Sequence, residues 1–230
     1  MTTRLLSAGA LVLGPLLWLC GLTIRAIAGA RVPDHLRDEP FAVPGELAVY
    51  RLDPALVVAG YAVFLAGAVV MVIAVAVLTR LATPGAPVLA PVGGLLLATG
   101  LGARLYWAGV EQTAFGLADA YGTEFAVAFV LDAYADLSYG PWRLPVIAAC
   151  GQYAGGALLA AALYRARVLG LGRALVVAWW ATIWGGVLKA AGWGELPGAL
   201  LLVLILVPVA IEVGRTGSVR PSSRRRLLSW

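Results

Sequence analysis

The chain has 230 residues, of which 61% are hydrophobic and 13% charged, and its formal net charge is +5. This composition is too apolar for a soluble globular domain and is typical of a polytopic membrane protein. The single histidine, His35, excludes a multi-histidine metal site, and Cys20 and Cys150 do not form a CxxC pair. We therefore expect neither thiol redox chemistry nor a cysteine-based zinc site.

Six apolar stretches are candidates to cross a bilayer as helices, which takes about 20 residues each. They cover residues 5–27, 54–78, 88–110, 145–168, 175–191 and 197–211. We predict an all-α fold, a single transmembrane helix bundle over residues 1–214 with a basic tail at 215–230. The first stretch could also be a cleaved signal peptide, but its length and the arginine behind it favour a retained helix.

The charges are distributed unevenly between the two sides that this topology defines. With both termini in the cytoplasm, ten of the seventeen basic residues fall on the inner side, as the positive-inside rule requires. We expect the basic tail to bind anionic lipid headgroups rather than nucleic acid. Eleven of the twelve acids fall on the outer side. For four of these, Asp34, Asp38, Glu39 and Glu46, we expect a solvated outer surface.

The third stretch and the segment that directly follows it contain ionisable residues that a lipid-embedded helix rarely carries. Arg104 and Glu111 are seven residues apart, so they lie near one stripe of a helix. An unpaired arginine inside a membrane costs at least a few kcal/mol, which places this stripe toward the bundle interior. The pair can serve function, or it can be a buried ion pair that only orients the helix. Asp119 follows in the same acidic segment.

Residues 123–137 are too short and too acidic to span a membrane easily. We predict a short interfacial or re-entrant helix over the outer mouth of the bundle. Asp132 and Asp136 share one of its faces, four residues apart, and repel each other. If that face is buried, one carboxyl group becomes a proton donor near neutral pH. If the face is wet, both are ordinary surface acids.

Aromatic residues gather near these acids in the sequence. Some belong to an interfacial aromatic belt, and others can form a cage that stabilises a cation. The candidates for substrate binding, together with Arg104 and Asp119, are Tyr106, Trp107, Phe115, Trp142, Trp180 and Trp184. Further along, Gly151 and Gly155 form a GxxxG pattern, which predicts close helix contact.

The sequence contains no P-loop, no GxSxG elbow and no HExxH motif. A strong acid, an apolar cavity and aromatic walls are sufficient for one reaction, the protonation-initiated cyclisation of a prenylated substrate. In this scheme Glu111, held by Arg104, takes up the final proton, and Asp132 or Asp136 is the acid. We expect no metal and no cofactor.

The segments "ARLYWAGVEQTAFGLADAYG" and "YGPWRLP" give the chain a resemblance to a known kind of protein. The chain resembles small bacterial integral membrane proteins of the membrane-bound terpenoid (meroterpenoid) cyclase kind. The resemblance implies a lipophilic prenylated substrate and no magnesium-dependent ionisation of a diphosphate, and no DDxxD or DxDD motif is evident. No family active site is carried over residue by residue. Two other functions stay open: a non-enzymatic signalling or assembly protein, and a small-solute or proton-coupled transporter.

Overall fold

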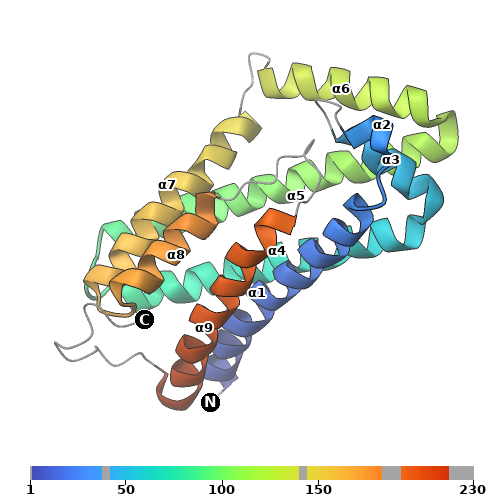
Figure 1. The fold of residues 1–230 in the computed structure, drawn as a ribbon. Helices are drawn as coiled ribbons and strands as arrows, with labels where there is room; N and C mark the ends of the chain where they lie inside the picture. Colours follow the sequence, from blue (N-terminus) through green and yellow to red (C-terminus); the bar gives the residue numbers. More distant parts are fainter. Residues whose placement is uncertain (1, 38–41, 140–143, 183–192, 218–230) are drawn as a thin grey trace.

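The computed structural model describes residues 2–37, 42–139, 144–182 and 193–217. These residues form helices joined by turns, with no strand among them, which confirms the predicted all-α class. Figure 1 shows their arrangement. The elements are α1 (Thr2–Gly29), α2 (Asp34–Arg37), α3 (Val43–Leu52), α4 (Pro54–Ala82), α5 (Leu89–Tyr121), α6 (Thr123–Tyr139), α7 (Leu144–Arg165), α8 (Leu171–Thr182), the 3-10 turn η1 (Trp193–Glu195) and α9 (Leu196–Thr216).

Four segments of the described chain are long and apolar enough to cross a membrane. They are α1, α4, α5 and the segment Trp193–Thr216, which contains α9. Helices α7 and α8 occupy the predicted fourth and fifth spans but are not among these four, and residues 183–191 of the fifth lie outside the described residues. The structure therefore supports a membrane protein with at least four apolar helices, and six crossings remain a prediction.

The long helices pack in pairs through small residues. Gly67 of α4 faces the backbone of Trp18 on α1, where an added Cβ would lie 2.5 Å from the Trp18 nitrogen. The second pair is α5 and α7, where Gly151 and Gly155 lie against the α5 backbone at Leu96 and Leu97. The GxxxG prediction is thus confirmed: these glycines let two helices approach more closely than larger side chains would allow.

Helix α5 is longer than predicted. It continues without a break from Leu89 to Tyr121 and ends at Gly122, whose φ of +93° favours glycine. The predicted span ended at Val110, but no proline or turn sequence stops the helix there. At about 1.5 Å per residue, its 33 residues extend about 50 Å, which exceeds the hydrocarbon core of a bilayer.

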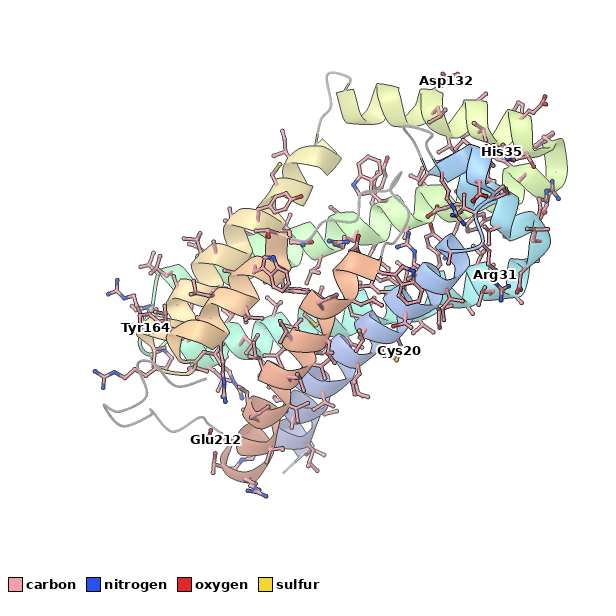
Figure 2. All side chains as sticks on the ribbon, in the orientation of Figure 1. Cys20, Arg31, His35, Asp132, Tyr164 and Glu212 are labelled. Atoms are coloured by element: carbon pink, nitrogen blue, oxygen red, sulfur yellow. The ribbon has the colours of Figure 1, made fainter. Side chains whose placement is uncertain are left out.

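The projecting end of α5 organises a second hydrophobic core. One core joins the long helices, and the other joins the end of α5 to α3, α6 and the adjoining ends of α1 and α4. We call α2, α3, α6 and residues 111–121 the cap. In Figure 1, α6 turns back from the end of α5 and crosses above the bundle, as expected for a helix over its mouth. Figure 2 shows His35 and Asp132 in the cap, and Tyr164 and Glu212 at the opposite end.

Candidate functional site

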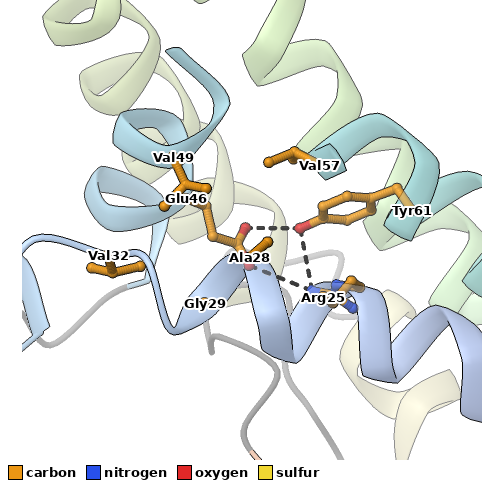
Figure 3. Close-up of a pocket in the computed structure, with 8 residues that line it drawn as sticks. All are labelled: Arg25, Ala28, Gly29, Val32, Glu46, Val49, Val57 and Tyr61. Carbon is orange, nitrogen blue, oxygen red and sulfur yellow. Dashed lines mark hydrogen bonds and ion pairs between the residues drawn. The ribbon is translucent and has the colours of Figure 1, made fainter. Parts of the chain in front are cut away.

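An arginine, a glutamate and a tyrosine from three helices meet where the cap joins the bundle (Figure 3). Tyr61 Oη donates a 2.8 Å hydrogen bond to Glu46 Oε2. Arg25 Nη2 lies 3.4 Å from Glu46 Oε1 and 3.2 Å from Tyr61 Oη, donating to both. The Arg25 guanidinium carbon also lies 4.4 Å from the centre of the Tyr61 ring. Only 14% of the Glu46 side chain and 11% of the Arg25 side chain are exposed.

Local sequence features place these three side chains. Arg25 lies near the end of α1, and Tyr61 lies two turns into α4. Helix α4 begins at Pro54, behind Asp53, whose Oδ1 accepts a 3.1 Å hydrogen bond from the Leu56 nitrogen. This hydrogen bond at the N-terminus of α4 fixes where the helix starts, and with it the direction in which Tyr61 points.

The cluster lines an apolar cavity. Its volume is about 20 Å³, and one side is open. That is room for roughly one water molecule. The lining residues are Arg25, Ala28, Gly29, Val32, Glu46, Val49, Val57 and Tyr61.

The surroundings of Glu46 favour its protonated form. Burial raises the pKa of the Glu46 carboxyl above its usual value, because a carboxylate is poorly solvated among valine side chains. The charge of Arg25 and the hydrogen bonds from Tyr61 and Arg25 lower the pKa, but burial outweighs them. The pKa of Glu46 is thus raised, while Arg25 and Tyr61 stabilise the carboxylate once the group ionises.

The expectation that Glu46 is a solvated surface acid is wrong. Its helix α3 buries Val43, Leu47 and Val49 in the cap core, and this packing carries Glu46 inward. The apolar residues around it in "VPGELAVY" were a signal of an amphipathic helix. By contrast, the side chain of Asp34 is 92% exposed, as predicted, and it pairs with Arg37. Residues 38 and 39 lie outside the described residues.

A second set of contacts fastens α3 to α5. Tyr50 Oη donates a 2.6 Å hydrogen bond to Asp119 Oδ2, and Arg51 Nη1 lies 3.2 Å from Asp119 Oδ1. Arg51 also donates to the Ala118 carbonyl in the last turn of α5, where a cation is favoured by the helix dipole. The Tyr50 ring stacks on Phe115 at 4.6 Å between centroids. The bond to Asp119 raises the pKa of Tyr50, because only the protonated phenol can donate it.

Arg104 lies deeper, in the bundle core. Its Nε donates a 2.8 Å hydrogen bond to Gln152 Oε1 on α7, and Gln152 Nε2 donates to the Ala181 carbonyl on α8 at 2.8 Å. Gln152 is fully buried, and Arg104 is 6% exposed. The Arg104 guanidinium also lies 4.9 Å from the Trp18 ring, which packs edge-on against Trp180. These contacts tie four helices together and meet much of the cost of burying an arginine.

The other predicted site residues divide between several places. Trp107 and Phe115 are buried in the cap core, whereas Tyr106 is 39% exposed and packs against Trp107. These predicted cage residues therefore do not lie together: Trp107 and Phe115 belong to the second core, whereas Trp180 belongs to the core of the long helices. Asp132 is exposed on the outer face of α6. The side chains of Glu111 and Asp136, and the residues Trp142 and Trp184, lie outside the described part of the chain.

A row of rings and guanidinium groups links the two polar centres. The Arg25 guanidinium lies 5.3 Å from the centre of the Phe64 ring. The Phe64 and Trp18 ring centres are 4.5 Å apart, and the Arg104 guanidinium also contacts the Trp18 ring. Glu195, in the turn η1, interacts electrostatically with Arg104 and with Arg25. The row therefore runs from the Glu46 cavity into the bundle, with a second carboxylate beside it.

No protein-family model matches the sequence, and neither a curated protein nor a solved structure matches the chain.

Proposed function

We propose that this chain is an integral membrane terpenoid cyclase, which isomerises a lipophilic prenylated substrate by protonation. The observation that carries the proposal is the Glu46 carboxyl group, buried in an apolar cavity and hydrogen-bonded by Tyr61 and Arg25. A carboxyl group whose pKa is raised in such a place is suited to general acid catalysis. Glu46 takes the role of acid here, which the sequence had suggested for Asp132 or Asp136.

The reaction is an isomerisation, so the substrate and the product have the same molecular formula. The Glu46 proton adds to one carbon of an alkene, using the π electrons for the new C–H bond, and leaves a cation on the adjacent carbon. A second alkene attacks that cation and closes a ring. Loss of a proton to a carboxylate then restores a double bond. Among the described residues, Glu195 is the candidate for this base; Glu111 remains the candidate from sequence.

Arg25 and Tyr61 make proton release from Glu46 feasible. When Glu46 gives up its proton, the resulting carboxylate faces the Arg25 charge and accepts the Tyr61 hydrogen bond. Both interactions are stronger with the ionised form, so they lower the barrier to protonating a weakly basic alkene. Burial raises the pKa of Glu46 and so increases the share of the carboxyl group that holds a proton at the start.

The proposal places the cap on the outer side of the membrane and both termini inside. The beginning of α1 and the end of α9 lie together, with Gly217 against the Arg4 side chain, which is consistent with an even number of crossings. The amphipathic helix α6 then lies in the outer interface. Its exposed rings Phe125 and Phe129 are suited to contact lipid there.

The test is a deuterium-incorporation assay in membranes. The chain is expressed with a polyprenyl diphosphate synthase and an aromatic prenyltransferase, in ordinary water and in D₂O, and lipid extracts are compared by mass spectrometry. A cyclase produces an isomer of unchanged mass in water, and in D₂O the new C–H bond carries deuterium from the acid. If well-expressed protein yields no isomer from any prenylated substrate offered, while proteoliposomes take up a solute, the transporter alternative replaces this one.

A further inference from the structure

We infer that the end of the bundle opposite the cap binds the headgroup of an anionic phospholipid through Arg80, Arg165, Arg167 and Arg173. We call these four residues the arginine cluster. The inference goes beyond the proposed function and does not depend on it, because the cluster is remote from the Glu46 cavity. It also differs from the expectation for the basic tail, because the cluster belongs to the helices and the turn that joins two of them.

Helix packing brings the arginine cluster to one end of the bundle. Its members lie in the last turn of α4, the last turn of α7, the turn after α7 and the first turn of α8: Arg80, Arg165, Arg167 and Arg173. The turns that follow α4 and α7 touch, because a Cβ added at Gly85 would lie 2.5 Å from the Ala166 Cα. Helix α8 packs against α7, and Tyr164, next to Arg165 in the sequence, marks this end in Figure 2.

The side chains of the arginine cluster are not neutralised by the part of the chain that the structure describes. Within those residues, none of the four side chains forms a hydrogen bond or an ion pair, and Arg80, Arg165 and Arg167 are exposed. Glu212 is the one described acid at this end of the bundle. The positive charge of the cluster is therefore left for an anion outside the chain.

The arginines near the cap are held in the opposite way. Each described arginine there forms an ion pair with an acid of the chain. These pairs are Arg25 with Glu46, Arg31 with Asp53, Arg37 with Asp34, and Arg51 with Asp119. The contrast shows that the fold supplies partners for arginines at one end and leaves the cluster at the other end without them.

An anionic lipid matches the cluster in charge and in place. Guanidinium groups bind phosphate oxygens through paired hydrogen bonds. The cluster lies at the end of the membrane-length helix α4, where the phosphate groups of a bilayer lie. Leu171, Leu175 and Trp179 follow at four-residue spacing and form an exposed apolar stripe on α8 that begins at this end. A phospholipid places its phosphate on the arginines and its acyl chains along such a stripe, which a free phosphate ion cannot use.

The experiment measures lipid binding to the purified chain in detergent by native mass spectrometry. The probes are phosphatidylglycerol and, with the same acyl chains, phosphatidylcholine, which carries a phosphate but no net charge. The test variant combines Arg165→Gln with Arg167→Gln. The matched control combines Arg31→Gln with Arg37→Gln, which removes two cap arginines whose side chains are 50% and 53% exposed.

Two further variants separate the alternatives. Arg165→Lys with Arg167→Lys keeps both positive charges, so it distinguishes loss of charge from loss of structure. Arg224→Gln, Arg225→Gln and Arg226→Gln together remove three charges of the basic tail and leave the arginine cluster intact.

We expect the test variant to weaken the apparent Kd for phosphatidylglycerol by roughly ten- to thirty-fold, since each basic residue near anionic lipid contributes about five-fold. The control should bind as the wild type does, and the lysine variant should retain most of the preference over phosphatidylcholine. Wild-type affinity for phosphatidylglycerol in the test variant would overturn the inference. So would an equal loss in the control, an equal loss in the lysine variant, or a preference abolished by the tail variant alone. None of these measurements depends on turnover, so a failure of the proposed cyclase leaves the test intact.

Discussion

Tyr61 on α4 donates a 2.8 Å hydrogen bond to Glu46 on α3, across the joint between the transmembrane bundle and its cap. Arg25 on α1 closes the same cluster from the third side. Three helices thus converge on one carboxyl group whose pKa is raised by burial.

Removing either neighbour should raise the pKa of Glu46 further. Both the Arg25 charge and the Tyr61 hydrogen bond favour the ionised carboxylate and so lower its pKa against the effect of burial. We expect Arg25→Met and Tyr61→Phe each to move the titration of the carboxyl C=O infrared band to higher pH, Arg25→Met by more. Subtracting the Glu46→Gln spectrum isolates this band. An unchanged titration in Arg25→Met would show that Arg25 does not act on Glu46.

Glu46 should also make stability depend on pH. Its pKa is raised in the folded state, so between about 4.5 and the folded value the native chain binds more protons than the unfolded chain. The contribution of Glu46 is therefore fully present below about pH 4.5 and is lost as pH rises through the folded pKa. We expect the stability of the wild type relative to Glu46→Gln to fall across this window, by at most about 1.4 kcal/mol per pH unit. Thermal unfolding in detergent over this range measures it, and a constant difference would contradict the prediction.

The close approach of α1 and α4 gives a test of packing. Gly67→Ala places a methyl group 2.5 Å from the Trp18 backbone, which cannot move aside as a flexible side chain would. We expect a loss of about 1–3 kcal/mol, seen as a lower unfolding temperature. Gly9→Ala on α1 is the control, because no atom lies within 4 Å of its added methyl group. Equal effects of the two substitutions would mean that the helices do not meet at Gly67.

Arg104 and Gln152 should behave as a coupled pair. Gln152→Leu removes the acceptor of a buried arginine and the donor to the Ala181 carbonyl, so it should cost roughly 1–3 kcal/mol. The double variant Arg104→Leu, Gln152→Leu should lose less than the sum of the two single losses. A double-mutant cycle on unfolding in detergent measures the coupling, and strict additivity would contradict it.

The sequence predicted the helical class, the main apolar helices and the close contact of α7 with α5, because these depend on local hydropathy and on small residues. It did not predict the site around Glu46. Arg25 and Glu46 are 21 residues apart, and Tyr50 and Asp119 are 69 apart, so no periodicity connects them. The seven-residue spacing of Arg104 and Glu111 suggested a pairing within one helix, whereas the hydrogen bond from Arg104 to Gln152 joins that helix to another. Such pairings are set by how helices pack, which a single stretch of sequence does not encode.

The most direct test of the central claim is deuterium incorporation by wild type and by Glu46→Gln at matched protein levels in D₂O membranes. Glutamine keeps the shape of Glu46 but has no acidic proton to donate. We predict that the wild type forms a cyclised isomer carrying deuterium and that Glu46→Gln forms none, while Asp34→Asn, at an exposed acid of the cap, retains full activity. A Glu46→Gln variant that still produces the deuterated isomer at the wild-type rate would contradict the assignment of Glu46 as the acid.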